Sequence, residues 1–118
     1  MAIKTIAVDF DSTLVTTVPY PYLGVVRENA KEVLDRFVEA GHEVIIWSCR
    51  DKEVIVDFLN QHEIPYHAIN ENTEHLKMTW GNNPRKIGAD LFIDDKNIFA
   101  KEIDWYEIEK ELIRLKWL

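Results

Sequence analysis

The stretch Thr5-Ile6-Ala7-Val8-Asp9-Phe10-Asp11-Ser12-Thr13-Leu14-Val15 decides the fold of this chain. Its apolar run at 6–8 predicts a buried strand. Two acids, Asp9 and Asp11, come next, and the hydroxyl of Thr13 follows them. Carboxylates that close a core strand need a cation, a hydrogen-bond shell or a catalytic task. A turn or a helix cap at the second acid is the simpler alternative.

Size and composition fit one domain that spans residues 1–118. Hydrophobic residues make up 47% of the chain, enough for a packed core, and the net charge is -7. That charge argues against a nucleic-acid scaffold and leaves a phosphorylated nucleic-acid end as the exception. The single cysteine, Cys49, fits a reducing cytoplasm. No stretch at the N-terminus reads as a signal peptide or a membrane span, so we expect a cytoplasmic protein.

Helical and strand patterns alternate along the rest of the chain. The patterns predict helices at 27–40, 51–62 and 104–117, and strands at 43–47, 66–69 and 89–93. Residues 16–26 contain two prolines and a glycine, which is typical of a flap over the acids or of an ordinary surface loop. Residues 70–85 are polar and mixed, and we expect a loop there as well. The apolar stripe of the last helix, which begins at Trp105, is interpreted as core rather than interface.

This alternation predicts an α/β fold with a parallel sheet and helices on both faces. The carboxyl ends of the strands then share one edge, where ligands bind in such sheets. Polar side chains follow three of the four predicted strands at that edge, and a lysine precedes the last strand. They are Asp9, Asp11, Ser48, Lys86, Asp94 and Asp95. Capping alone does not explain four acids there, because like charges repel one another.

A hard divalent cation such as Mg2+ would explain this edge, because it binds carboxylates and the oxygens of a substrate phosphate. Asp9 is then placed to attack phosphorus as a carboxylate nucleophile. Asp11, two residues further on, suits a general acid and base. Ser48 and Lys86 are candidates to hold the phosphate oxygens and their charge. We therefore expect a small phosphorylated substrate.

These residues resemble the motifs of the haloacid dehalogenase-like (HAD) hydrolase superfamily. The segment Asp9-Phe10-Asp11-Ser12-Thr13 resembles its first motif, and Asp94-Asp95 its fourth. Ser48 and Lys86 are similar to the second and third motifs and occur in the expected order. The resemblance covers the chain from about Thr5 to Asn97.

The resemblance implies a three-layer α/β/α Rossmann-like domain with strand order 3-2-1-4. It implies an aspartyl-phosphate phosphatase in which Asp9 is the nucleophile and Asp11 the acid and base. Mg2+ would be held by Asp9, by Asp94 and by the backbone carbonyl of Asp11, with Asp95 orienting a metal-bound water. The candidates for binding phosphate or substrate are Thr13, Ser48, Cys49, Arg50 and Lys86.

The gaps at 12–26 and 70–85 are too short for the cap domain of larger relatives, so the chain resembles the capless members. An open site leaves substrate choice to the flap, to a bulky substrate or to a partner subunit, so a homo-oligomer is an attractive hypothesis. The substrate class stays open among nucleotides, sugar phosphates and polymer ends. For the third motif, Lys77 is the alternative to Lys86.

Several residues near these motifs keep two interpretations. Arg50 either binds the phosphate or forms a salt bridge with Asp51 or Glu53. Cys49 reads as a buried packing residue, with a reactive thiolate as the alternative. Asn70, like Asn72, either touches substrate or forms a turn. The four histidines show no zinc-binding spacing.

Two other functions compete with the phosphatase. A response-regulator-like phospho-acceptor domain also gathers acids, a hydroxyl and a lysine at one sheet edge. It would place two neighbouring acids on its first strand and its acceptor on a middle strand, whereas Asp9 and Asp11 are separated by one residue. A scaffold that keeps the motifs without turnover is the third possibility.

Overall fold

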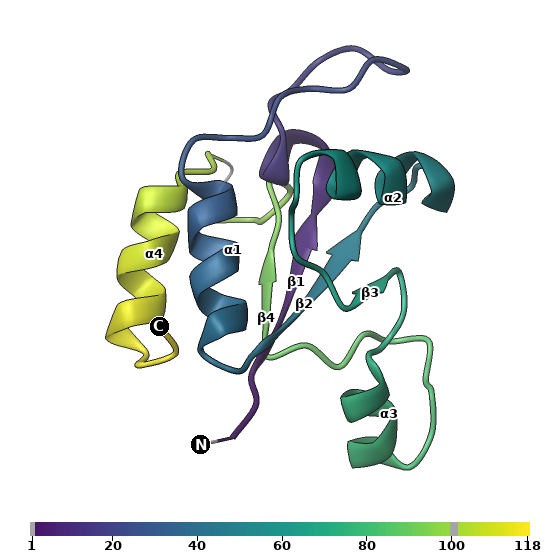
Figure 1. Cartoon of the computed structure of the whole chain (residues 1–118), viewed down its shortest axis with the longest axis vertical. Coiled ribbons are helices and arrows are strands. Elements are labelled where there is room, and N and C mark those ends of the chain that lie inside the picture. The colour runs from purple at the N-terminus through teal and green to yellow at the C-terminus, as the bar shows by residue number, and fades with distance from the viewer. Residues whose placement is uncertain (1, 100–101) are drawn as a thin grey trace.

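The computed structural model describes residues 2–99 and 102–118 (Figure 1). In this part of the chain, four strands form one sheet in the order β3-β2-β1-β4, and every neighbouring pair is parallel. The strands are β1 (Thr5–Asp9), β2 (Glu43–Trp47), β3 (Ala68–Ile69) and β4 (Leu91–Ile93). The helices are α1 (Ala30–Glu39), α2 (Lys52–Gln61), α3 (Glu74–Trp80) and α4 (Trp105–Arg114). The predicted α/β class, parallel sheet and strand order are confirmed.

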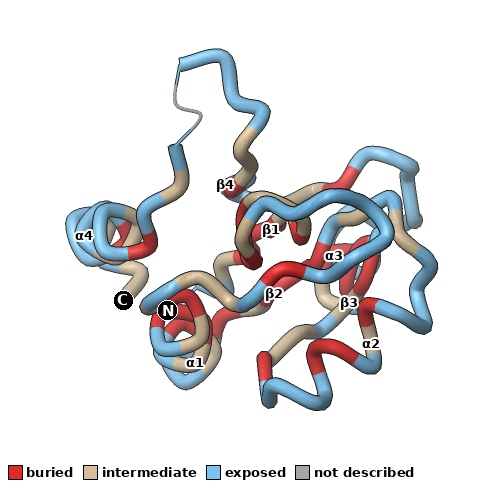
Figure 2. The backbone as a smooth tube through the Cα atoms, turned by 90° about the horizontal axis from the view of Figure 1, so that it is seen from above, coloured by how far each residue is buried: buried red, intermediate tan, exposed pale blue. Residues whose placement is uncertain are grey.

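The larger part of the core lies between the sheet and the helices α1, α2 and α4. Because side chains alternate across a strand, Ile6 and Val8 of β1 point to this face together with Val44 and Ile46 of β2. All four are fully buried, and Figure 2 shows the buried residues gathered along the strands and on the helix sides that face them. Trp105 of α4 is also buried there, as the stripe of the last helix predicted.

The opposite face of the sheet is covered by α3 and by the segment 81–90 that follows it. Ala7 and Ile45 meet Leu76 and Ile87 in this smaller cluster. The expectation of a loop at 70–85 is therefore wrong in part, because α3 lies within it. The helix begins where the Thr73 hydroxyl accepts a hydrogen bond from the Leu76 amide, and it ends at Gly81 in a left-handed conformation.

The helices α1, α2 and α4 and the strands β3 and β4 match their predicted places with shorter bounds. Strand β2 has the predicted bounds, and β1 extends one residue beyond the predicted run at each end. Helix α1 starts at Ala30 rather than at residue 27, because Asn29 before it is left-handed, with φ 69°. No helix in the described ranges has the length and the apolar character needed to cross a bilayer.

The chain between β1 and α1 rises as a loop above the carboxyl edge of the sheet (Figure 1). Its base is closed by a hydrogen bond from the Thr16 amide to the Val25 carbonyl at 2.8 Å and by an antiparallel bridge between Val15 and Val26. Of the two interpretations of residues 16–26, the structure favours the flap. In the described ranges no inserted domain stands over this edge, as the capless prediction required.

Candidate active site

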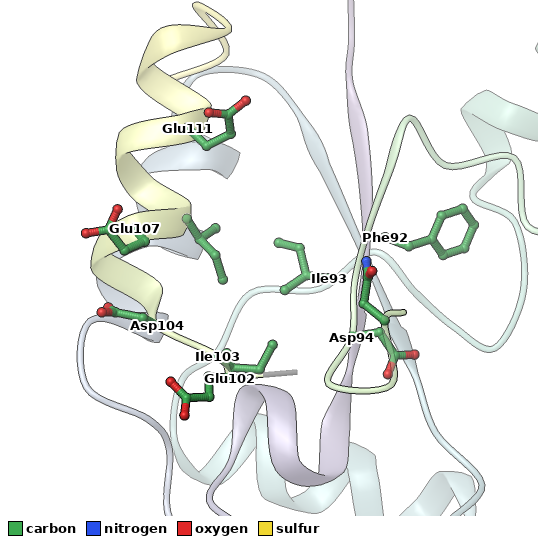
Figure 3. Close-up of a pocket in the computed structure, with 10 residues that line it drawn as sticks. Phe92, Ile93, Asp94, Glu102, Ile103, Asp104, Glu107 and Glu111 are labelled. Atoms are coloured by element: carbon green, nitrogen blue, oxygen red, sulfur yellow. The ribbon is translucent and has the colours of Figure 1, made fainter. Parts of the chain in front are cut away.

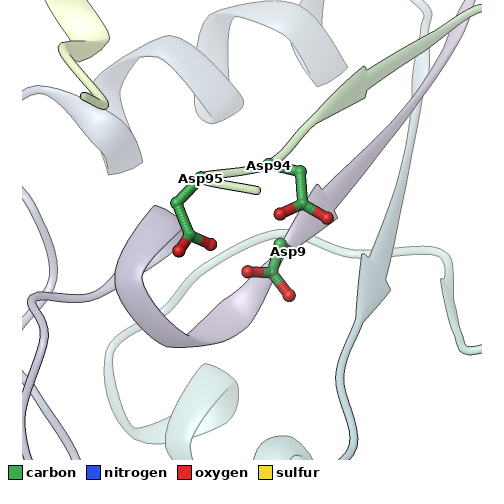
Figure 4. Close-up of side chains that lie close together, drawn as sticks. All are labelled: Asp9, Asp94 and Asp95. Atoms are coloured by element: carbon green, nitrogen blue, oxygen red, sulfur yellow. The ribbon is translucent and has the colours of Figure 1, made fainter. Parts of the chain in front are cut away.

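Three carboxylates meet where β1 and β4 end. Asp9 is the last residue of β1, and Asp94 and Asp95 directly follow β4, which pairs with β1 through Val8 and Ile93. One oxygen from each aspartate lies within 4.8 Å of the others, and Figure 4 shows the three side chains converging. The sequence predicted these acids at one edge, and the structure brings them together.

A tight turn after β1 separates the first acid from the second. Residues 10–14 form a kinked turn in which the backbone of Asp11 is extended and that of Ser12 is left-handed, with φ 64°. Phe10, Thr13 and Leu14 point inward and are fully buried, whereas the side chain of Asp11 is 44% exposed. The turn is anchored from α4, whose Trp105 donates its indole N–H to the Thr13 carbonyl at 3.0 Å. Asp9 and Asp11 therefore face different surroundings although they are two residues apart.

The crowding of the acids changes their proton affinity. Burial, a hydrogen bond with Asp95 and the negative charge of Asp94 together raise the pKa of Asp9 from 3.8 to about 7. Burial acts in the same direction on Asp95, but hydrogen bonds from Asp9 and Thr13 outweigh it and leave the pKa of Asp95 below its usual value. Asp9 therefore binds a proton more readily than an isolated aspartate does.

The raised pKa of Asp9 indicates that a cation would fit among these acids. Three half-buried carboxylates repel one another, and a bound proton lowers that repulsion. A divalent cation at the same place would offset the negative charge of the carboxylates more fully than a proton does. The donors are all oxygens, which suits Mg2+. Asp94 already accepts a hydrogen bond from the Lys96 amide at 2.9 Å on one oxygen, which orients its carboxylate. The residues present therefore fit the predicted metal.

Asp11 is bound by Arg50. Nε of Arg50 donates to Oδ2 of Asp11 at 2.8 Å, and Nη2 donates to Oδ1 at 2.9 Å. These hydrogen bonds raise the pKa of the Arg50 guanidinium above its usual range. The partner of Arg50 is thus neither Asp51 nor Glu53, the two salt-bridge partners suggested by the sequence.

Ser48 follows β2 at the same edge, and Asn70 holds it in place. The Asn70 amide accepts from the Ser48 N–H at 2.8 Å and donates to the Ser48 carbonyl at 2.7 Å. The Ser48 hydroxyl oxygen accepts a hydrogen bond from the Arg50 amide at 3.0 Å. Its own hydrogen is therefore free to donate to a ligand. Asn70 acts on this site through Ser48.

A cavity of about 400 Å³ opens beside these groups. Its lining consists of Asp9, Trp47, Ser48, Cys49, Asn70, Asp94 and Lys96. Lys96 brings a positive charge to a site rich in acids, and Trp47, 39% exposed, brings an aromatic surface. Neither residue was predicted from the sequence. For Lys96 a signal was present, because it directly follows the acid pair and so shares its edge of the sheet.

The predicted lysines lie elsewhere. Lys86 is exposed, does not line this cavity, and sits on the segment that crosses below the strands toward β4 (Figure 1). That segment reaches the amino end of the sheet, where the Asp90 amide donates to the Thr5 carbonyl at 2.7 Å. Lys77 lies on α3 and pairs with two nearby glutamates. The structure therefore does not bring Lys86 or Lys77 to the cluster, because this chain approaches β4 from the opposite end.

The exposure of Cys49 differs from what the sequence predicted. The sequence favoured a buried packing residue, whereas the side chain is exposed and lines the cavity. It follows β2 at the edge of the sheet, outside the helices that cover the two faces of the sheet in the described part of the chain. Thr13 also differs from its predicted role, because it is fully buried and hydrogen-bonds Asp9 and Asp95. Thr13 holds Asp9 and Asp95 in place from the buried side of the site.

A second cavity, of about 490 Å³, lies between β4 and α4 (Figure 3). Ile93, Ile103 and Ile108 contribute apolar lining, and acidic side chains surround it. The acids are Asp94, Glu102, Asp104, Glu107 and Glu111. The described lining residues include no cation, so this cavity would repel a phosphate. The cavity beside Lys96 is the better candidate for an anionic ligand.

Comparisons with known proteins identify a protein of similar fold and give no information on the chemistry of the site. No protein-family model matches the chain, and no curated protein matches it. A solved structure of a conserved protein from Bacteroides thetaiotaomicron is similar, with a TM-score of 0.78 and 34% sequence identity. The similarity covers 98% of this chain and 93% of that protein. With this identity over almost the whole of both chains, the protein belongs to the same family as that conserved Bacteroides protein.

Proposed function

We propose that this protein is a Mg2+-dependent phosphomonoester hydrolase of the capless HAD type. One observation carries the proposal. Asp9, at the tip of the central strand β1, lies with its carboxylate among those of Asp94 and Asp95 and opens on a cavity that also contains a lysine. A nucleophile, a cation site and a positive charge for an anion are thus adjacent.

The metal would be held by the carboxylates of Asp9 and Asp94, with Asp95 beside them. When bound, Mg2+ supplies positive charge that offsets the repulsion between the carboxylates and a phosphate. Thr13 keeps Asp9 and Asp95 oriented through its buried hydroxyl. That orientation comes from the fold and costs nothing at the moment of reaction.

The chain's own residues then divide the reaction into two steps. An oxygen of Asp9 forms a bond to phosphorus as the bond to the leaving oxygen breaks. Asp11 gives its proton to the leaving oxygen, and to carry that proton it must first free one of the two oxygens that accept from Arg50. Water next attacks the phosphorus of the aspartyl-phosphate, gives its proton to Asp11 and releases phosphate from Asp9. The sum is one ester and one water converted to an alcohol and phosphate, with both aspartates restored.

Two residues of the cavity suit the phosphate. The Ser48 hydroxyl has its hydrogen free to donate, because its oxygen is already oriented by the Arg50 amide. Lys96 provides the positive charge that was expected of Lys86 from the sequence. The cavity volume of about 400 Å³ suits a small phosphorylated substrate.

Release of phosphate from p-nitrophenyl phosphate, with Mg2+ and with a chelator, tests the proposal. We expect turnover that requires Mg2+ and is lost in Asp9→Asn. Absence of turnover with any divalent metal would favour a scaffold, and full activity of Asp9→Asn would exclude this nucleophile. Acid-labile phosphate that persists on the protein for minutes would instead indicate a phospho-acceptor domain.

A further inference from the structure

Arg50 occupies an unusual position for a residue beside a candidate phosphate site. It lies in the turn between β2 and α2, two residues after Ser48, yet its side chain is only 8% exposed. A guanidinium that waits for a substrate phosphate would be open to solvent. This guanidinium is instead enclosed by other parts of the chain.

The donors of Arg50 are almost all in use. Besides its two hydrogen bonds to Asp11, Nη1 donates to the Pro21 carbonyl at 3.1 Å and Nη2 donates to the Tyr22 carbonyl at 2.8 Å. The guanidinium also lies 5.2 Å from the centre of the Tyr20 ring. A guanidinium has five N–H groups, so the paired fork that would bind a phosphate is occupied by Asp11.

These contacts hold the tip of the flap. In the described part of the chain, the hydrogen bonds that join residues 18–23 to the rest of the protein come from Arg50. Burial does not fix the tip, because Tyr20 is 80% exposed and Tyr22 71% exposed. One side chain therefore connects three parts of the site: the Asp11 turn, the flap above it and the corner that carries Ser48.

We propose that Arg50 is a positioning residue, which fixes the Asp11 carboxylate and the flap relative to the aspartate cluster and does not bind the substrate's phosphate. The catalytic part of this inference rests on the proposed phosphatase function. The structural part, that Arg50 holds the flap, does not. Lysine cannot replace it, because an ammonium is a point charge without the planar fork that reaches a carboxylate and two carbonyls together.

Two measurements on Arg50→Ala and Arg50→Lys test the proposal, with the exposed Arg85→Ala as the matched control. The first is chymotrypsin cleavage after Tyr22, followed by mass spectrometry, which needs no activity. We expect cleavage to be at least about tenfold faster in both Arg50 variants, since release of a loop raises the population of its open form. The control should be cleaved at the rate of the unaltered protein.

The second measurement separates kcat from phosphate affinity under saturating Mg2+. We expect kcat to fall about 10- to 100-fold in both variants, because a displaced catalytic group loses rate steeply. The inhibition constant of inorganic phosphate should change less than about twofold, since a positioning residue does not contribute to phosphate binding. Tens of millimolar guanidinium should restore part of kcat in Arg50→Ala and leave kcat of Arg85→Ala unchanged.

The opposite results overturn the proposal. A large rise in the phosphate inhibition constant with kcat unchanged would make Arg50 a phosphate ligand. Unchanged cleavage after Tyr22 would show that other contacts hold the flap, and full activity of Arg50→Lys would show that the fork is not needed. If the unaltered protein releases no phosphate, the proposed function fails, while the cleavage experiment still decides whether Arg50 holds the flap.

Discussion

The buried hydroxyl of Thr13 joins the turn after β1 to Asp95, 82 residues further along the chain. Its Oγ1 lies 3.1 Å from Oδ1 of Asp95 and accepts the Asp95 backbone N–H at 3.0 Å. The same oxygen lies 3.2 Å from Oδ2 of Asp9. One residue thus connects the tips of two neighbouring strands at the point where the three carboxylates meet, so the geometry of the cluster depends on it.

Removing this hydroxyl should damage both stability and metal binding. Thr13→Val keeps the shape but leaves the Asp95 amide without its acceptor, and we expect a loss of about 1–3 kcal/mol in the free energy of unfolding, measured in urea. Mg2+ affinity, measured by calorimetry, should fall as well. Thr17→Val is the control, because the Thr17 hydroxyl bonds the Ser12 side chain in an exposed position. Equal effects of the two substitutions would contradict the role given to Thr13.

The raised pKa of Asp9 predicts how stability depends on pH when no metal is bound. The folded protein holds a proton on Asp9 up to about pH 7, whereas the unfolded chain releases it near 3.8. The contribution of Asp9 to stability is therefore fully present below about pH 4 and is lost as the pH rises to about 7. Urea unfolding in chelator across this range should show the decline, and Asp9→Asn should flatten it. An unchanged slope in that variant would assign the effect to another group.

Metal binding should depend on the same proton, with the opposite sign. The carboxylate of Asp9 must lose its proton to bind Mg2+, so we expect affinity to weaken by up to about tenfold for each pH unit below about 7 and to level off above it. Calorimetric titrations at pH 6 and pH 8 check this, and the pH 8 titration should show the tighter binding. Stronger binding at pH 6 would mean that Asp9 is not a ligand.

The acid cluster could be predicted from the sequence because topology alone creates it. Asp9 and Asp94 each follow an apolar run, and parallel strands bring their carboxyl ends to one edge whatever the details of packing. Helix α3 was missed because it is only seven residues long and buries one side chain, Leu76, so its apolar pattern is weak.

The pairing of Arg50 with Asp11 could not be found in the same way. The two residues are 39 positions apart, and their contact depends on how the flap folds back over the corner after β2. Asp51 and Glu53 were the predicted partners because they are close to Arg50 along the chain, and the sequence alone does not show which distant residues come together in space. Lys86 was chosen for a similar reason: its position before β4 is visible in the sequence, whereas the path of residues 81–90 across the amino end of the sheet is not.

Lys96 and Lys86 are the two candidates for the positive charge that binds the phosphate. Lys96 lines the cavity beside Asp9, whereas Lys86 is exposed on the segment that leads to the other end of the sheet. We expect Lys96→Met to lower kcat/KM for p-nitrophenyl phosphate about 10- to 1,000-fold, because it removes the positive charge that lines the cavity beside Asp9. Lys86→Met should stay within about twofold, as is usual for an exposed side chain away from a site. Thermal unfolding of both variants controls for folding. If the two effects were reversed, the motif-based assignment would be right and the cavity would not be where the phosphate binds.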